Sequence, residues 1–222
     1  MSADRPTPDH VVLVDESDAP LGREQRDVAH RGEGQLHRAF TLLVLDHDDR
    51  LLLARRAEDK TLWPGCWDGT LASHPVDGEA YAEAAARRID EELLRRGLVA
   101  PSPDHLVRFR YQARDGDRGS EHELCTALVV RLPADDVLAP VAGEIDALEW
   151  VDAAALIDRA GREPRSLCPW LLMSLMHLPR GDDKNVTDAV RRALQAWAAP
   201  GMVAAATAAL ADHDVGLDAQ PG

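Results

Sequence analysis

Three histidines and two glutamates are of the types and spacings that bind a divalent metal ion. His30 and His37 flank the segment RGEGQL, and His74 follows the turn-rich segment WDGTLAS. Glu121 and Glu123 are two residues apart, so on a β-strand both carboxylates would lie on one face. Imidazoles and carboxylates together suit Mn²⁺, Fe²⁺, Zn²⁺ or Mg²⁺. The alternative is that the histidines are surface or hydrogen-bonded core residues and that the glutamates form a solvated strand face.

Charged residues between positions 79 and 96 could bind a phosphate group. Glu92 is one of several acidic residues in this segment, and Arg87 and Arg88 lie in the middle of the segment. A helix carboxylate can hold Mg²⁺, which bridges to substrate phosphates, and an arginine can contact the phosphate oxygens directly. The alternative is an exposed helix that carries salt bridges.

Other candidates lie on either side of this run. Arg56 ends an apolar segment, and Lys60 is one of only two lysines, Lys60 and Lys184, which hints at a specific role but also suits a surface position. Tyr111 and Trp170 could form the wall of an apolar pocket, although filling the core is the simpler role for each aromatic side chain alone.

Composition and charge restrict the class of partner. The 222 residues carry a net charge of −14, which disfavours nucleic acid or an anionic membrane as the main partner but allows a local basic pocket. There is no apolar run that could span a bilayer and no signal-peptide segment. Three cysteines without CxxC spacing indicate neither a disulfide framework nor a zinc knuckle. We expect a cytoplasmic protein with reduced thiols, as a monomer or a homodimer.

The elements that must position these residues follow an α+β order. Apolar runs bounded by turns predict strands over residues 10–15, 40–46, 51–55, 106–113, 123–132 and 148–151. Apolar spacing predicts helices over residues 78–96 and 169–178. A further helix is expected to begin after Asp152, which would be its N-cap, and an Ala-rich pair of helices is expected over 187–211, split at Pro200. We expect a disordered tail over residues 1–9, a catalytic domain over 10–180 and an Ala-rich helical extension over 181–222.

The chain resembles one known enzyme family. RRAEDKTLWPGCWDGTLASHPVDGEAYAEAAARRIDEEL is similar to the centre of type 1 isopentenyl-diphosphate isomerases, which belong to the Nudix superfamily. AHRGEGQLHRAF, FRYQA, GSEHELC and CPWLLM resemble further segments of that family, in the same order and at compatible distances. The resemblance covers about residues 10–178. It implies a Nudix-type mixed sheet in an α-β-α sandwich, with additional C-terminal helices.

The resemblance implies a role for each group of candidates. One divalent metal would be bound by His30, His37, His74, Glu121 and Glu123. A second ion, Mg²⁺, would be held by Glu92 and would bridge to the diphosphate of a prenyl substrate. The diphosphate contacts would be Arg56, Lys60, Arg88 and Arg26, the last at a position where a lysine is usual. Tyr111 and Glu123 match the acid of the proton-transfer pair, and Trp170 matches the aromatic side chain that shields a carbocation.

The sequence departs from the family pattern at Ala72. In the isomerases this position is a cysteine that faces the alkene opposite the glutamate, whereas here Ala72 is followed by Ser73. A methyl group cannot exchange a proton. Cys66, six positions earlier, is expected to be a packing residue. Ser73 is a poor base and would point to the other side of a strand.

Three kinds of function follow from this departure. The protein could isomerise isopentenyl diphosphate or a relative, with Glu123 or a water taking the second proton. It could instead direct the cation to a second alkene or to water, which would be cyclisation or hydration of a longer prenyl diphosphate. A diphosphate hydrolase or a binding module is less favoured, because RRIDEELLRRGL departs from the hydrolase signature REUXEEXGU.

Overall fold

The computed structural model describes residues 10–94, 102–132, 138–177, 187–197 and 200–216. Its strands are β1 (His10–Val14), β2 (Pro20–Gln25), β3 (His37–Leu45), β4 (Leu51–Arg56), β5 (Trp67–Asp68), β6 (Thr70–Ser73), β7 (Asp104–Arg114), β8 (Ser120–Arg131), β9 (Ile145–Val151) and β10 (Asp214–Gly216). Its helices are α1 (Arg26–Ala29), α2 (Tyr81–Arg88) with the π-helical segment Ile89–Leu94, α3 (Ala153–Arg162), the 3₁₀ turn Pro164–Ser166, α4 (Pro169–Met176), α5 (Asp188–Trp197) and α6 (Pro200–Leu210).

The strands form one mixed sheet with β3 at its centre. The hydrogen-bonded path runs β10-β7-β8-β3-β1-β2, and β4 and β6 also pair with β3. β8 runs parallel to β3 from the pair His37–Glu123 to the pair Leu45–Arg131, whereas β6 is antiparallel to it. β4 pairs with β5 and with β9. Segments far apart in the sequence therefore meet beside β3.

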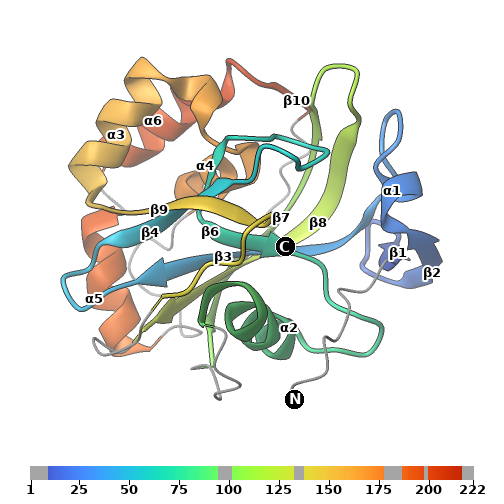
Figure 1. Cartoon of the computed structure of the whole chain (residues 1–222), viewed down its shortest axis with the longest axis horizontal. Coiled ribbons are helices and arrows are strands. Elements are labelled where there is room, and N and C mark those ends of the chain that lie inside the picture. Colours follow the sequence, from blue (N-terminus) through green and yellow to red (C-terminus); the bar gives the residue numbers. More distant parts are fainter. Residues whose placement is uncertain (1–9, 95–101, 133–137, 178–186, 198–199, 217–222) are drawn as a thin grey trace.

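Helices cover both faces of this sheet. α2 lies on one side, and α3, α4 and α6 lie on the other (Figure 1). Phe40, Leu42 and Val44 of β3 pack in the core beneath α2, whereas Ala39 and Leu43 pack in the core beneath α4. A strand that is buried on both faces carries a continuous apolar run, as residues 39–45 do. The expected α+β fold, with a mixed sheet between helical layers, is confirmed.

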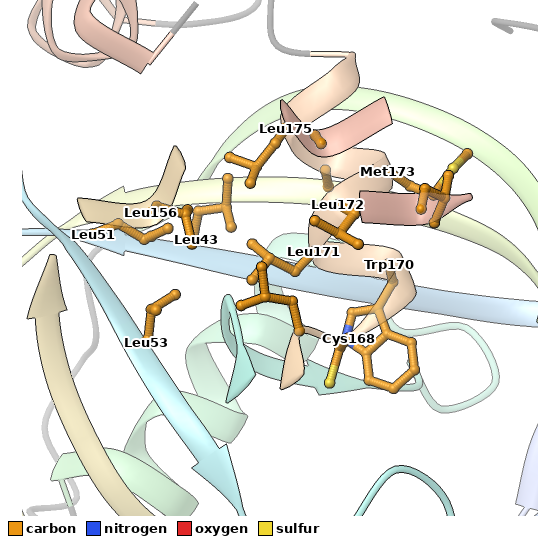
Figure 2. Close-up of a cluster of buried hydrophobic side chains, with 14 of the residues drawn as sticks. Leu43, Leu51, Leu53, Leu156, Cys168, Trp170, Leu171, Leu172, Met173 and Leu175 are labelled. Carbon is orange, nitrogen blue, oxygen red and sulfur yellow. The ribbon is translucent and has the colours of Figure 1, made fainter. Parts of the chain in front are cut away.

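The core beneath α4 contains several large aliphatic side chains. Figure 2 shows Leu171, Leu172 and Leu175 of α4 together with Leu43 and Leu51 of the sheet. The helices after residue 187 share this core, because Val190, Leu194, Trp197 and Met202 are buried in it. The described part of the Ala-rich segment thus packs against the sheet domain.

Several elements differ from the sequence-based expectations. The helix expected over 78–96 begins at Tyr81 and widens into π-helical geometry at Ile89. The strands β2, β5, β6 and β10 and the four-residue helix α1 were not expected. β2 is exposed along most of its six residues, so it has no alternating apolar pattern, and the other elements are too short for one. The N-cap at Asp152 is confirmed, since its Oδ1 accepts a hydrogen bond from Ala155 N at 2.8 Å.

Some expectations fall outside the described residues. They are the disordered tail over 1–9, the end of the α2 segment beyond residue 94, and the chain from 181 to 186. Within the part of the chain that the structure describes, no helix is both long and apolar enough to cross a bilayer.

The close packing at Gly69, between β5 and β6, gives a stability prediction. A Cβ at Gly69 would lie 2.7 Å from Leu43 Cδ2 and 3.1 Å from Leu171 Cδ1. We expect Gly69→Ala to lower the free energy of unfolding by ~1–3 kcal/mol, because overpacking forces neighbouring side chains to shift. Gly161 of α3 has open space around the same position, so Gly161→Ala should instead raise stability by ~0.5–1 kcal/mol. Urea unfolding monitored by circular dichroism would measure both, and a Gly69→Ala protein as stable as the wild type would contradict the prediction.

Candidate functional site

The sheet brings the candidate metal ligands together. His37 begins β3 and pairs with Glu123 on the parallel strand β8. Glu121, two residues before Glu123, lies on the same face of β8. His74 directly follows β6, which pairs with β3, and His30 ends α1, where its carbonyl oxygen accepts a hydrogen bond from Ser120 N at 2.9 Å.

The ligand atoms of these five residues all lie within 4.8 Å of one another. His37 Nε2 is 3.3 Å from His30 Nε2 and 3.2 Å from His74 Nε2. Glu121 Oε2 is 2.9 Å from His30 Nε2, and Glu123 Oε1 is 3.4 Å from His74 Nε2. Three imidazoles and two carboxylates that converge in this way fit a divalent cation with mixed nitrogen and oxygen ligands.

A hydrogen bond outside the cluster fixes the orientation of its central imidazole. His37 Nδ1 lies 2.7 Å from the carbonyl oxygen of Gln35. A carbonyl can only accept, so Nδ1 is the donor, and the lone pair of the neutral ring is on Nε2, which faces the other ligands. Metal-binding histidines commonly have such a partner on the second ring nitrogen.

The electrostatic environment suppresses positive charge on one imidazole and favours negative charge on a carboxylate. Burial lowers the pKa of His74 to about 4, so its ring is neutral at neutral pH. Burial also opposes ionisation of Glu123, but the neighbouring imidazoles of His37 and His74 outweigh it and lower the pKa of the carboxyl group. For His30, burial is the largest single effect and lowers the pKa, but Glu121 and Glu123 together outweigh it and leave the pKa above its ordinary value.

Tyr111 lies behind Glu123 and donates a hydrogen bond to it. The two residues are cross-strand neighbours on β7 and β8, and the Tyr111 hydroxyl donates to Glu123 Oε2 at 2.7 Å. Burial, followed by the charge of Glu123, raises the pKa of Tyr111 well above its usual range, so the phenol keeps its proton. Glu123 borders the cavity described next and Tyr111 does not.

A cavity of about 350 Å³ opens beside the cluster. Its wall includes His30, His74, Glu121 and Glu123 from the cluster, together with Trp170 from α4. The four expected diphosphate contacts, Arg26, Arg56, Lys60 and Arg88, also line it. A cavity of this size is in the range of small-ligand sites. The structure thus places the candidate metal ligands, the basic residues and Trp170 around one space.

Glu92 lies beside this cavity and not in its wall. It borders a small adjoining space of about 20 Å³, together with Lys60, Arg56 and Glu144. Glu92 forms an ion pair with Arg88, and Lys60 forms one with Glu144. Both Arg88 and Glu92 belong to the turn where α2 becomes π-helical, a distortion that is frequent at functional sites. Carboxylates next to a basic cavity wall suit Mg²⁺.

Ala72 lies in the cavity wall, as expected from its place in the sequence. It pairs with Thr41 across β6 and β3. Ser73, which was expected to point away, also lines the cavity, as does its partner Phe40; the cavity therefore reaches beyond the face on which Ala72 lies. Cys66 is not in the lining, and its Sγ lies 3.6 Å from the carbonyl oxygen of Arg165.

Several residues at this site were not identified from the sequence. Among them, Asp68 and Glu144 border the small space with Glu92, and Cys125 lines the main cavity. Asp68 could have been noticed, because it is an acidic residue in an otherwise apolar and turn-forming segment, WDGTLA. Glu144 lies in a charged turn before β9, where nothing in the pattern separates it from a surface residue.

The convergence of the histidines gives a metal-binding prediction. We expect His37→Ala to weaken Mn²⁺ binding, because His37 lies between the other two imidazoles. The loss should be at least ~10–100-fold, which is the effect of removing a residue that only supports a metal ligand. Titration calorimetry with Mn²⁺, and metal content after dialysis, would measure the change. His10 is a matched control, since it is an exposed histidine at the start of β1 and belongs to neither group of candidate metal ligands in the described residues; His10→Ala should bind Mn²⁺ as the wild type does. Equal binding by the His37 and His10 variants would rule out the cluster as the metal site.

Comparison with known proteins places this geometry in a family. The profile of the NUDIX domain family matches residues 35–171. The isopentenyl-diphosphate Delta-isomerase of Halobacterium salinarum is 39% identical over 186 residues, which cover 82% of this chain and 85% of that protein. The enzyme of the same name from Haloarcula marismortui is 41% identical over 171 residues, covering 74% and 88%. The one from Leifsonia xyli subsp. xyli is 36% identical, covering 81% and 97%.

A solved structure agrees at the level of the fold. The crystal structure of a Deinococcus radiodurans protein superposes with a TM-score of 0.53 at 24% identity and covers 69% of this chain and 90% of that one. The matches to named relatives extend over most of the chain. The NUDIX match includes His37, His74, Glu121 and Glu123 of the metal cluster, and His30 lies before it. The protein is a member of the isopentenyl-diphosphate Delta-isomerase family within the Nudix superfamily.

Proposed function

We propose that the protein is an isopentenyl-diphosphate isomerase-like enzyme that protonates a C=C bond of a prenyl diphosphate. One observation carries this proposal: four of the five candidate metal ligands, a cluster of basic residues and an aromatic side chain line the same cavity. The names of the relatives support the same substrate class. The activity would require a divalent metal at the His/Glu cluster and Mg²⁺ at the diphosphate.

The basic residues would hold the diphosphate. Arg56 is partly buried, with 17% of its side chain exposed, and Arg88 is 5% exposed, so both could bind an anion with limited competition from water. Lys60 lies close enough to them that their charges, after burial, help to lower its pKa. A diphosphate would relieve this repulsion among cations, and Mg²⁺ held by Glu92 would supply further positive charge to it.

Glu123 and Tyr111 would deliver the proton. Glu123 touches the cavity, and the Tyr111 hydroxyl behind it is protonated and already donates to it. Because the Tyr111 hydroxyl donates to Glu123 Oε2 at 2.7 Å and Glu123 borders the cavity, this pair would hold a proton within reach of a bound alkene, as general acid catalysis requires. A divalent ion bound by the cluster would supply positive charge that orients this carboxyl group.

Trp170 would stabilise the product of protonation. The π electrons of the alkene take the proton, a C–H bond forms, and a tertiary carbocation remains. Trp170 is 3% exposed and lines the cavity, so its ring can face a cation in a site from which water is largely excluded.

The second proton transfer is where Ala72 matters. Isomerisation requires a base to remove a proton from the neighbouring carbon, and the methyl group of Ala72 cannot act as one. Glu123 itself or a water would have to take that proton. A second candidate function is favoured by this one position: after protonation the cation would be captured by another alkene or by water, in a longer prenyl chain for which the small Ala72 side chain leaves room.

The first functional prediction concerns the acid. With Mg²⁺ in D₂O, the wild-type protein should incorporate deuterium at carbon into isopentenyl, dimethylallyl, geranyl or geranylgeranyl diphosphate while the diphosphate stays intact, as followed by NMR and mass spectrometry. Glu123→Gln should reduce incorporation by ~10²–10⁴-fold, because an amide cannot pass on a proton. Glu149→Gln is the control, since Glu149 is on β9 outside the cavity and pairs with Arg159. Release of phosphate without exchange at carbon would contradict the proposal and indicate a hydrolase.

The second functional prediction concerns the missing base. We expect Ala72→Cys to raise the rate of isopentenyl diphosphate isomerisation by ~10²–10⁴-fold, since it restores one member of an acid-base pair. Ala155→Cys, at an exposed position of α3, controls for effects of an added thiol, and product formation would be measured by chromatography. No gain at Ala72, together with cyclic or hydrated products from a longer diphosphate, would contradict isomerisation and favour the second candidate function.

A further inference from the structure

Asp68 is a buried carboxylate that the proposed chemistry does not use. It ends the two-residue strand β5 and is 2% exposed. Burial raises the pKa of Asp68, and Arg56, Gly69 N–H and Trp170 oppose this effect. An ionised group at such a position costs free energy unless its partners compensate. Its partners therefore indicate what it does.

The partners of Asp68 are two residues assigned above to different parts of the substrate. Trp170 Nε1 donates a hydrogen bond to Asp68 Oδ1 at 2.7 Å, and Gly69 N donates to the same oxygen at 2.6 Å. Arg56 Nη1 lies 3.7 Å from Asp68 Oδ2. Asp68 thus links the tryptophan that would face the carbocation with an arginine that would hold the diphosphate. Figure 2 shows Trp170 on α4 with its ring extending away from Leu171 and Leu172.

Arg56 is held in place from its other side. Its Nη2 donates to the carbonyl oxygen of Leu62 at 2.9 Å, and its Nε lies 3.2 Å from that of Trp63. The remaining nitrogen, Nη1, faces Asp68 at a distance beyond that of a hydrogen bond. The ion pair therefore leaves the Nη1 protons able to reach an anion in the cavity, which Arg56 lines.

The arrangement poses an electrostatic problem that Asp68 solves. The Arg56 guanidinium carbon lies 5.2 Å from the centre of the Trp170 ring. A permanent positive charge there would repel a carbocation that forms against the same aromatic residue. A carboxylate beside both groups offsets the arginine charge. Its hydrogen bond to the indole N–H also draws positive charge to the edge of the ring, which makes the ring face more favourable to a cation.

We propose that Asp68 is a positioning residue. It fixes Trp170 against Arg56, and its negative charge offsets the positive charge of Arg56 at the place where the reacting carbon would lie. The inference rests on the proposed function and deepens it. The Asp68 carboxylate would act through the Trp170 indole and the Arg56 guanidinium, without touching the substrate.

Asp68→Asn tests the proposal, because asparagine keeps the shape and a hydrogen-bond acceptor but loses the charge. We expect kcat for the prenyl diphosphate to fall by an amount comparable to the ~10–100-fold found for outer-shell partners of active-site groups. KM and the affinity for inorganic pyrophosphate with Mg²⁺ should stay equal or improve, since the Arg56 charge is no longer offset. The indole N–H resonance of Trp170, assigned with Trp170→Phe, should move upfield because its acceptor is no longer ionised.

Asp46→Asn is the matched control. Asp46 is also a buried carboxylate paired with an arginine, Arg50, but it lies in the turn between β3 and β4 and outside the cavity. The kcat and the pyrophosphate affinity of the Asp46→Asn protein should equal those of the wild type. A purely structural role for Asp68 would lower thermal stability and pyrophosphate affinity together with kcat, and that result would overturn the proposal.

The readouts separate this proposal from the proposed function. If the wild-type protein turns over and Asp68→Asn keeps its kcat, the positioning role is wrong and the function stands. If the wild type incorporates no deuterium at carbon, the proposed function is wrong. In that case the indole resonance and the pyrophosphate titration still decide whether Asp68 couples Trp170 to Arg56, and no change in either would overturn that coupling.

Discussion

The pairing register of β3, β7 and β8 is the constraint on which the site depends. The parallel pairing of β3 with β8 sets His37 beside Glu123, and the antiparallel pairing of β7 with β8 sets Tyr111 beside the same carboxylate. Side chains alternate along a strand, so a slip of one residue would turn the ligands to the opposite face. Apolar cores on both sides of β3 make such a slip costly. The packing of the domain and the convergence of the ligands thus have the same cause.

Charge compensation is the second principle of the site. An acidic chain of net charge −14 concentrates several cations around one cavity, and several of them have a carboxylate partner, among them Arg56 with Asp68, Arg88 with Glu92 and Lys60 with Glu144. A buried cation without a partner would be strongly destabilising. These pairs therefore let the basic wall persist without an anion, while the same carboxylates lie where a second metal ion could share them.

Much of the fold and of the candidate site was accessible from the sequence. Long apolar runs such as residues 39–45 and the helix stripe ending at Leu93 predicted their elements because burial imposes periodicity. The cluster of three histidines and two glutamates was found from residue types and family motifs together. The pairing of β6 with β3, the π-helical turn and the partners of Asp68 were not, because they depend on contacts between segments that no local pattern records.

The walls of the cavity come from separate layers of the molecule. Three of the candidate ligands, His37, Glu121 and Glu123, are on the long central strands β3 and β8, whereas Trp170 is on α4. His74 directly follows the four-residue strand β6 that contains Ala72, so a change in β6 would affect both residues. A change in α4 can therefore reshape the cavity around Trp170 without moving the two strands that hold most of the ligands. Such a division would let related proteins keep one arrangement of ligands while the shape of the space beside them varies.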